Sequence, residues 1–546
     1  MKRLLAVGAV ISAIFLLSFS PPADRYFEIA KNLDIFATLF REVNTLYVDE
    51  VNPNTLMKTG IDAMLASLDP FTNYIPDDEV EDYRTTNTGQ YGGIGAVTRE
   101  VNKRTVVTMI YEGYPAFKGG LKIGDEVIKM DEVELSKITV EQANHLMRGQ
   151  VGTPVSLTVK RYGVKDFIKL QFKREKIKIS NVPYFGMMAG NMGYVQLTNF
   201  TPDAGKEVRN AVASLKESGA KGIILDLREN PGGLLNEAVN ICNIFIPKGK
   251  LVVTMKGKIE KYNSAYETLN APTDLDIPVA ILINRGSASA SEIVAGTLQD
   301  YDRAVIVGEK SYGKGLVQLT RPVGYNSQIK ITTAKYYTPT GRCIQVLDYS
   351  HRRPDGSVGS IPDSIKKTFK TTRGRTVYDG GGVDPDVLLE NYSLAPVTQA
   401  LYVDGFLFDF ATIYASKHVT IGEARNFSLT DPEYQEFVNW IRTKEYKYHS
   451  PLELQLNQLI TSAKTERLYE DLRPQIDQLQ ARISESRKND LATFKDQIKA
   501  LLEAEITGRY YLERGQVEVS FKDDLEIRKS VEILNNAAQY RKILNF

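Results

Sequence analysis

Residues 279–299 read V-A-I-L-I-N-R-G-S-A-S-A-S-E-I-V-A-G-T-L-Q, and this stretch decides the fold. It opens with a largely apolar run of the kind that forms a strand buried in a sheet, and residues 291–299 have helical character. A second apolar run at 222–227 and a second helical stretch at 204–218 repeat the pattern. Because strands and helices alternate in this way between residues 193 and 387, we predict an α/β core there.

Ser289 falls at the turn between that strand and that helix. Such a turn exposes a hydroxyl, and the N–H of Ala290 points out of the helix N-terminus, where unpaired donors and the helix dipole favour a developing oxyanion. A structural interpretation competes with this one, because Ser289-x-x-Glu292 is also a capping box. Taken alone, the motif favours the structural interpretation, since capping serines far outnumber catalytic ones.

Lys314, in the segment S-Y-G-K-G at 311–315, is the candidate base. A lysine can deprotonate a serine only when its amine is neutral, so its pKa must lie well below the ordinary lysine value; burial beside small and apolar groups has that effect. Gly313 and Gly315 allow close approach, and Gln318 is suited to orient the amine, because an acidic partner raises the pKa instead. None of the four histidines falls in these segments: they are His145, His351, His418 and His449.

A second turn, L-D-L-R-E-N-P-G-G-L at 225–234, ends an apolar strand in paired glycines. Alone, this motif is best interpreted as an ordinary turn. In the same α/β core as Ser289 and Lys314, however, Gly232 and Gly233 become candidates to donate backbone N–H groups to an oxyanion. A nucleophile, a base, an orienting group and an anion site for acyl transfer are then all present.

The rest of the chain divides by composition. Residues 1–22 begin with basic residues, continue with a short apolar run and end in small or polar residues. This pattern predicts an export signal or an uncleaved anchor. Helical spacing marks residues 23–84, and short β-rich runs separated by glycine turns mark 85–175. The core is predicted at 176–395, and helix formers dominate 396–546, which predicts a helical tail.

Charge and cysteine content exclude several classes of partner. The 68 Lys and Arg nearly cancel the 67 Asp and Glu, so no overall field favours nucleic acid or anionic membranes. The basic segment 352–375 is interpreted as a solvated loop, with a substrate or nucleic-acid patch as the alternative. Cys242 and Cys343 lack metal-ligand spacing, and they allow one disulfide without requiring it. We expect no metal, no cofactor and no nucleic acid, and membrane contact only through an uncleaved N-terminal anchor.

Taken together, these segments resemble the carboxyl-terminal processing (tail-specific) serine proteases, which are periplasmic or lumenal Ser-Lys endopeptidases with a PDZ domain. The resemblance covers roughly residues 30–390. The motifs that carry it are S-A-S-A-S-E-I at 287–293, G-K-G-L-V-Q at 313–318, N-P-G-G at 230–233, Y-Y-T-P-T-G-R-C-I-Q at 336–345 and G-G-G-V-D-P-D at 380–386.

The resemblance implies a role for each candidate in the core. Ser289 is the implied nucleophile, with Ser287 and Ser291 as rivals within the motif, while Lys314 is the base and Gln318 the third member. The implied oxyanion donors are Gly232, Gly233 and Ala290.

The resemblance also implies a fold and a recognition site. The fold class is α+β and α/β multidomain: an N-terminal helical segment, a PDZ-like β domain, a ClpP- or crotonase-like α/β protease core and a C-terminal helical domain. Backbone N–H groups of Gly93, Ile94 and Gly95 are expected to bind a chain terminus. Arg148 is a candidate to couple the PDZ domain to the active site, with a plain surface charge as the alternative.

The expected protein is an exported serine endopeptidase of the periplasm or cell envelope that cleaves unfolded or C-terminally exposed proteins. The alternative is a catalytically silent PDZ scaffold or adaptor, against which intact Ser289, Lys314 and Gln318 argue. Whether the tail beyond residue 396 caps the protease, mediates homo-oligomerisation or binds an adaptor is left open by the sequence.

Overall fold

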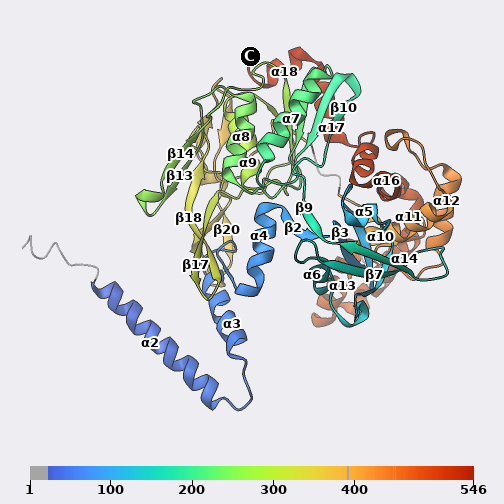
Figure 1. Cartoon of the computed structure of the whole chain (residues 1–546), viewed down its shortest axis with the longest axis horizontal. Helices are drawn as coiled ribbons and strands as arrows, with labels where there is room; N and C mark the ends of the chain where they lie inside the picture. The colour runs from blue at the N-terminus through green and yellow to red at the C-terminus, as the bar shows by residue number, and fades with distance from the viewer. Residues whose placement is uncertain (1–22, 390–392, 447, 449) are drawn as a thin grey trace, which may run out of the picture. The chain divides into compact units, whose positions relative to one another are not determined.

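The computed structural model describes residues 23–389, 393–446, 448 and 450–546 (Figure 1). The expected export signal at 1–22 lies outside these residues. The chain forms two compact units, Met1–Ile75 with Thr320–Ile331, and Pro76–Leu319 with Thr332–Phe546. Among the described helices, none combines the length and apolar character that crossing a bilayer requires.

The smaller unit confirms the predicted N-terminal helical segment. Its elements are α2 (Ala23–Leu46), α3 (Pro53–Ala66) and β1 (Asn73–Ile75). α3 begins after Asn52, whose side chain accepts hydrogen bonds from two backbone N–H groups of the first turn. β1 pairs antiparallel with part of β18 (Ser327–Tyr337).

The core of the larger unit is a six-stranded sheet in the order β10-β11-β12-β15-β16-β23. Its strands are β10 (Tyr184–Met188), β11 (Met192–Gln196), β12 (Gly222–Asp226), β15 (Val279–Ile283), β16 (Val305–Gly308) and β23 (Val387–Leu388). β10 is antiparallel to β11, and the other pairings are parallel. In β15, Ile281 and Ile283 join the apolar cluster on one face, and Ala280 and Leu282 join the cluster on the other. Burial on both faces explains the continuous apolar run that predicted this strand.

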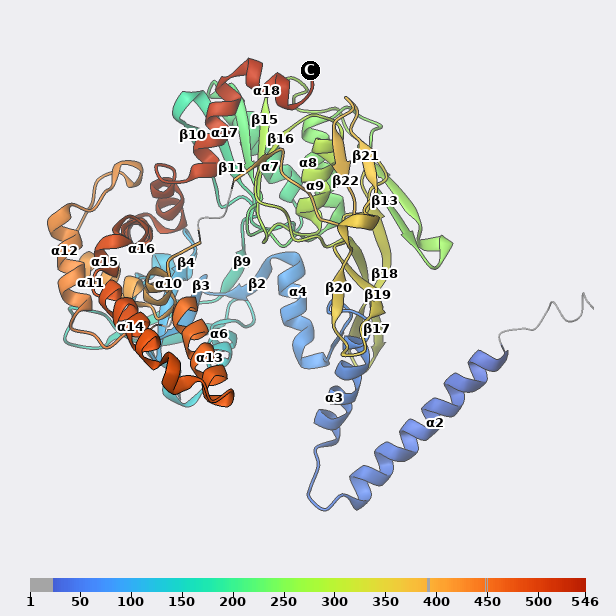
Figure 2. The same cartoon turned by 180° about the vertical axis from the view of Figure 1, so that it is seen from behind.

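Helices cover both faces of this sheet (Figure 1, Figure 2). The crossover helices α7 (Ala204–Glu217), α8 (Leu235–Phe245) and α9 (Ala290–Asp300) pack on one face. They share that face because the strand order advances in one direction, and right-handed crossovers then fall on one side. The opposite face is covered by α17 (Leu525–Asn535) and α18 (Ala537–Ile543). The α/β core is confirmed, and the last helices of the predicted tail complete it.

Tyr540 of α18 ties the tail to the sheet. Its hydroxyl accepts a hydrogen bond from the N–H of Val279 at 3.1 Å and donates to the carbonyl of Arg303 at 3.2 Å. We expect Tyr540→Phe to lower the free energy of unfolding by about 1–2 kcal/mol, because the buried Val279 N–H loses its acceptor. Urea denaturation measures this. Tyr511→Phe, which removes a more exposed hydroxyl bonded to Gly422, is the control, and equal shifts in both variants would contradict the docking role.

A second sheet carries Gln318 and Tyr336. Its strands are β13 (Leu251–Gly257), β14 (Ser264–Glu267), β17 (Leu316–Gly324) and β18, which also pairs with β1. The basic segment 352–375 follows it, within two short antiparallel pairs, and most of its residues are exposed. The strands of these pairs are β19 (Leu347–Arg352), β20 (Val358–Ser360), β21 (Thr368–Lys370) and β22 (Thr376–Tyr378).

The β domain holds a sheet in the order β3-β4-β5-β7-β8 and a separate pair, β2 with β9. The sheet strands are β3 (Ala96–Val101), β4 (Arg104–Ile110), β5 (Glu126–Met130), β7 (Pro154–Lys160) and β8 (Ile168–Lys173), with β6 (Val133–Glu134) paired to β5. The pair is β2 (Gln90–Gly93) and β9 (Glu175–Lys178). Helices α4 (Val80–Thr88), α5 (Pro115–Lys118) and α6 (Val140–Met147) flank these strands. Alternating inward residues of the sheet form one apolar core with α6.

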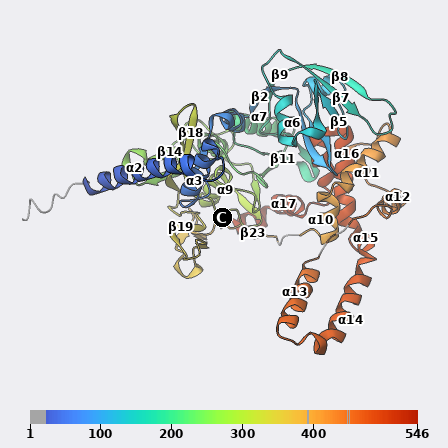
Figure 3. The ribbon, with the colours of Figure 1, turned by 90° about the horizontal axis from the view of Figure 1, so that it is seen from below.

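The helical part of the tail has its own core and includes a hairpin of α13 and α14 (Figure 3). Its helices are α10 (Pro396–Val403), α11 (Phe406–Lys417), α12 (Asp431–Ile441), α13 (Pro451–Thr465), α14 (Tyr469–Arg487), α15 (Asp490–Thr493) and α16 (Lys495–Ser520). The tail thus serves two purposes, because α10–α12, α15 and α16 build a separate core while α17 and α18 belong to the α/β core.

Candidate active site

Ser289 lies at the turn where β15 gives way to α9, immediately before the first helical residue, Ala290. Its backbone has φ 55° and ψ −110°, a combination that L-residues rarely adopt. Strained backbone of this kind persists only where the surroundings enforce it, and it clusters at functional sites. The side chain is half-buried, so it retains access to solvent.

The two rival serines of the motif are fully buried and engaged in the fold. The Ser287 hydroxyl donates to the carbonyl of Leu227 at 2.7 Å and accepts from the N–H of Asn284 at 2.9 Å. The Ser291 hydroxyl donates to the carbonyl of Asn230 at 2.9 Å. Both therefore hold the turn around Ser289 in place, and Ser289 is the serine of the three with solvent access.

The glycine turn after β12 packs directly on the turn that holds Ser289. Gly232 has φ 96°, and a Cβ at this position would lie 2.7 Å from the carbonyl oxygen of Ala288 and 2.8 Å from the nitrogen of Ala290. Only glycine fits such an approach. The Asn230 carbonyl accepts the N–H of Ala288 at 3.0 Å, which ties the two turns together.

The candidate oxyanion donors differ in their hydrogen bonds. The N–H of Gly232 donates to Oδ1 of Asn230 at 2.9 Å, so this group is already engaged. Within the part of the chain that the structure describes, the N–H groups of Gly233 and Ala290 find no acceptor. Unbonded donors beside a nucleophile are what a developing oxyanion requires.

Glu292 joins the serine and lysine segments, and it is the main site residue that the sequence interpretation missed. Its Oε2 accepts the N–H of Ser289 at 2.8 Å and the N–H of Lys314 at 2.9 Å. Its Oε1 accepts the Ser311 hydroxyl at 2.6 Å and the N–H of Gly313 at 2.7 Å. Full burial raises the pKa of this carboxyl above its ordinary value, against four hydrogen bonds that lower it. The capping-box contact is present, but the same carboxylate also binds the backbone N–H of Lys314.

Tyr336 of β18 makes a second bridge between these segments. Its buried hydroxyl lies 3.0 Å from the carbonyl oxygen of Ser289 and also within hydrogen-bonding distance of the carbonyl oxygen of Lys314. The N–H of Gly315 donates to Oε1 of Gln345 at 2.8 Å. Both bridging side chains come from the Y-Y-T-P-T-G-R-C-I-Q stretch, which explains why that motif accompanies the serine and lysine motifs.

Gln318 lies on β17, half-buried. Its Nε2 donates to the Thr332 hydroxyl on β18 at 3.1 Å, so its amide is held in a fixed orientation. Its action on the Lys314 amine stays a prediction.

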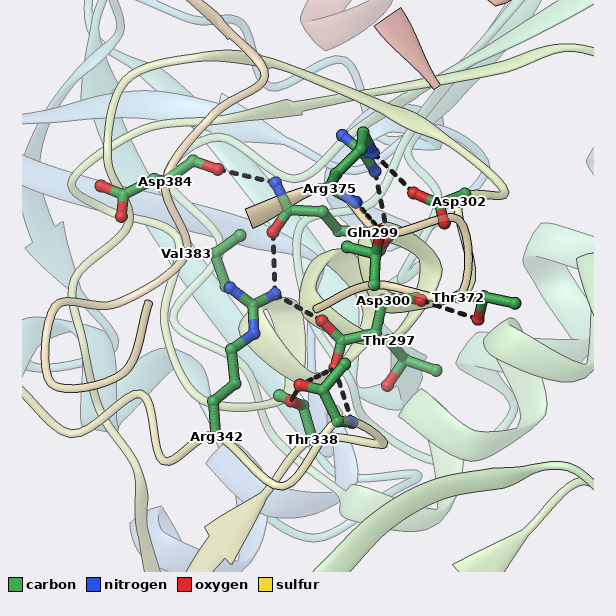
Figure 4. Close-up of polar contacts among 12 residues, drawn as sticks. Thr297, Gln299, Asp300, Asp302, Thr338, Arg342, Thr372, Arg375, Val383 and Asp384 are labelled. Atoms are coloured by element: carbon green, nitrogen blue, oxygen red, sulfur yellow. Dashed lines mark hydrogen bonds and ion pairs between the residues drawn. The ribbon is translucent and has the colours of Figure 1, made fainter. Parts of the chain in front are cut away.

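A buried ionic network secures the opposite end of α9 (Figure 4). Arg342 is 1% exposed and lies 2.9 Å from Oδ1 of Asp300, the last residue of α9. Its Nη2 also donates to Oε1 of Gln299 at 2.8 Å. Arg375 forms ion pairs with Asp302 and Asp386. Because removing one partner of a buried pair costs several kcal/mol, this network gives the helix that follows Ser289 a rigid anchor.

The loop between β2 and β3 holds the residues expected to bind a chain terminus. Gly95 has φ 78°, and a Cβ there would lie 2.6 Å from Cβ of Tyr114. The carbonyl of Ile94 accepts the N–H of Ala116 at 2.8 Å, which fixes the loop. Among the described residues, the N–H groups of Ile94 and Gly95 have no acceptor. Gly93 is the last residue of β2, paired with Glu175.

Arg148 is an ion-pair partner and not a free surface charge. Its Nη1 lies 2.7 Å from Oδ1 of Asp82 on α4, and its guanidinium stands 5.2 Å from the centre of the Tyr91 ring. His145 Nε2 lies 3.1 Å from the other oxygen of Asp82. These contacts connect the end of α6 to α4. The coupling role of Arg148 stays a prediction.

Cys242 and Cys343 are both free thiols. Among the described residues, no group of three or more His, Cys, Asp or Glu is placed to hold a metal ion.

Comparisons with known proteins identify the domains of this chain. The model of "Peptidase family S41" matches residues 191–349, that of the PDZ domain matches residues 84–160, and that of "Probable PDZ-protease, C-terminal helical domain" matches residues 397–534. The multidomain fold class expected from the sequence is thereby confirmed.

Individual proteins are also similar to this chain. The "Carboxy-terminal-processing protease" of Bartonella bacilliformis is 40% identical over 355 residues, which are 64% of this chain and 80% of that protein. A "Probable CtpA-like serine protease" of Staphylococcus aureus is 37% identical over 57% of this chain and 62% of its own length. The solved photosystem II D1 C-terminal processing protease is 25% identical with a TM-score of 0.35, over 66% of this chain and 87% of its own. The chain therefore belongs to peptidase family S41, as a serine-type peptidase with a PDZ domain and the C-terminal helical domain of PDZ-proteases.

Proposed function

We propose that the protein hydrolyses peptide bonds with Ser289 as nucleophile, Lys314 as general base and Gln318 as the group that orients the lysine. The observation that carries this proposal is the shared carboxylate oxygen of Glu292, which accepts the N–H groups of both Ser289 and Lys314. A bridge of this kind between the two backbones supports the proposal that the serine and the lysine belong to one site.

The proposed reaction begins when the Ser289 oxygen attacks the scissile carbonyl carbon and its proton passes to the Lys314 amine. The carbonyl oxygen becomes an oxyanion, for which the unbonded N–H groups of Gly233 and Ala290 are the proposed donors. The proposed role of Gly232 is to let its turn approach the turn of Ser289 closely, because its own N–H is engaged by Asn230. Collapse of the intermediate expels the amine, which takes the proton from Lys314, and water hydrolyses the ester by the reverse proton path.

The proposed substrates are unfolded or C-terminally exposed proteins of the periplasm or cell envelope. The unbonded N–H groups of Ile94 and Gly95 are suited to a terminal carboxylate, and an extended chain can then add to β3, the terminal strand of its sheet. Arg148 is the proposed link between this domain and α4. Export through residues 1–22 and assembly through the tail are also part of the proposal.

Incubation of an unfolded protein such as casein with the wild type and with Ser289→Ala tests the assignment. Mass spectrometry should find internal cuts with the wild type and none with the variant. Ser291→Ala is a matched control from the same motif: loss of its hydrogen bond to Asn230 lowers the rate, but the cut sites stay unchanged. Cleavage that survives Ser289→Ala refutes the nucleophile.

A further inference from the structure

The edge of the PDZ domain that would receive a peptide is already occupied. β3 is the terminal strand of its sheet, with β4 on one side and no strand on the other among the described residues. An edge strand presents unpaired N–H and C=O groups, and peptides use such edges by adding a further strand. β3 also begins directly after the loop of residues 93–95, so a chain whose terminus lies in that loop runs along this edge.

The occupant is the side chain of Asn144, which projects from α6 to the middle of β3. Its Oδ1 accepts the backbone N–H of Thr98 at 3.0 Å and the Thr98 hydroxyl at 3.1 Å. Its Nδ2 donates to the carbonyl of Thr98 at 3.0 Å. A carboxamide has the same donor and acceptor as a peptide group, so Asn144 makes the two backbone bonds that an added strand would make.

Contacts at the C-terminal end of α6 also hold the helix in this closed position. Arg148 and His145 both contact the Asp82 carboxylate of α4, at 2.7 and 3.1 Å. Ala143 and Met147 are buried in the core of the domain. α6 is therefore held against β3 by its own apolar face, by Asn144 and by Asp82.

We infer that Asn144 closes the peptide-binding edge of β3, and that a polypeptide with a free C-terminal carboxylate binds only after displacing this side chain. The inference rests on the proposed binding of chain termini by this domain. A peptide binds only those molecules in which the edge is open. Asn144 thus lowers the apparent affinity for every such peptide in proportion to that open fraction. A peptide must offer enough additional contacts to displace it, which makes Asn144 a determinant of selectivity.

The test measures peptide binding in the full chain carrying Ser289→Ala, so that the probe is not cleaved. The probe is a fluorescein-labelled decapeptide with an apolar last residue and a free carboxylate, beside the same peptide with an amidated terminus, and fluorescence anisotropy gives Kd. Asn144→Ala removes the amide, and Asn144→Leu removes its hydrogen bonds while keeping a side chain of similar size. Leu146→Ala is the matched control, because it shortens a more exposed side chain of the same helix.

We expect both Asn144 variants to bind the carboxylate peptide about five-fold to ten-fold more tightly than the parent, as removal of a few net hydrogen bonds predicts, and Leu146→Ala to bind like the parent. Should the parent prefer the carboxylate peptide while the Asn144 variants bind it equally or more weakly, the inference alone is wrong. Should no protein distinguish the carboxylate peptide from its amide, the proposed recognition of chain termini fails, and the inference fails with it.

Discussion

We expect the Lys314→Ala variant to keep its fold and its peptide binding but to lose proteolysis, with kcat/KM lower by about three orders of magnitude or more. This size follows from the loss of a general base whose nucleophile cannot be activated in another way. Glu292 and Tyr336 hold residue 314 through its backbone N–H and carbonyl groups, so we expect the segment to stay in place when the amine is removed. Cleavage of labelled casein gives the rate, anisotropy gives peptide binding, and the urea midpoint reports the fold.

Two further variants test whether residue 314 acts by proton transfer or only by its positive charge. Lys310→Ala removes a lysine of the same segment whose half-exposed ammonium pairs with Asp384 at 3.0 Å, and we expect nearly full activity because such pairs contribute little. Lys314→Arg keeps a cation that does not deprotonate at working pH, so it should be as inactive as alanine. Substantial activity in Lys314→Arg would mean that residue 314 acts by its charge, and the base assignment would be wrong.

The parts of the fold that follow from short-range pattern were predictable from the sequence. The apolar run at 279–283 and the helix after it need only a turn between them, and Ser289 lies in that turn. The strand and glycine turn at 222–233 followed from the same reasoning. In each case the burial pattern of adjacent residues carries the information.

The contacts that assemble the site join residues distant in sequence, and local pattern does not contain them. Tyr336 reaches back to residues 289 and 314 from a strand of another sheet. The sequence pattern explained Glu292 as a capping residue. That local role gave no reason to expect its contacts to Gly313 and Lys314. A signal was present, because a carboxylate followed by the apolar run I-V-A-G on a buried helix needs donors from elsewhere.

The tail shows the same limit. Its helix-rich composition predicted a helical domain, but α17 and α18 cover the open face of the core sheet. Composition shows that a helix has an apolar face, but it does not show which surface of the protein that face packs against. The one-sided arrangement of α7, α8 and α9 was the physical reason to expect such a cover, and it became evident only from the strand order.

Glu292→Gln is expected to lower kcat about 100-fold while the free energy of unfolding changes by about 2 kcal/mol at most. Gln has the same shape, but its amide nitrogen cannot accept a hydrogen bond, so one of the two donor pairs around the carboxylate loses its acceptor. The two unsatisfied buried donors together cost about 2–6 kcal/mol, and removal of a buried charge offsets most of that cost. Activity falls more than stability does, because a displacement of about 1 Å between nucleophile and base is enough for a 100-fold loss.

The control is Glu309→Gln, which makes the same change at a mostly buried carboxylate paired with Arg285 at 3.3 Å. We expect its kcat to stay within about two-fold of the wild type, as for a pair with one exposed partner. Casein cleavage under saturating substrate, with urea denaturation in parallel, measures both quantities. An equal loss of kcat in the two variants would show that the effect is general, and an active Glu292→Gln would exclude the positioning role.

The pH dependence provides an independent test, because burial raises the pKa of Glu292 above the ordinary glutamate value. Since the folded state then holds this proton more tightly than the unfolded state, the stability contributed by Glu292 is present below the unfolded-state pKa and is lost as pH rises through the raised pKa. Activity should change in the opposite direction over the same window, because deprotonation restores two acceptor oxygens for the Ser289 and Lys314 segments. In Glu292→Gln this part of both profiles should be flat, whereas a merely structural carboxylate would leave the pH–activity profile of the variant identical to that of the wild type.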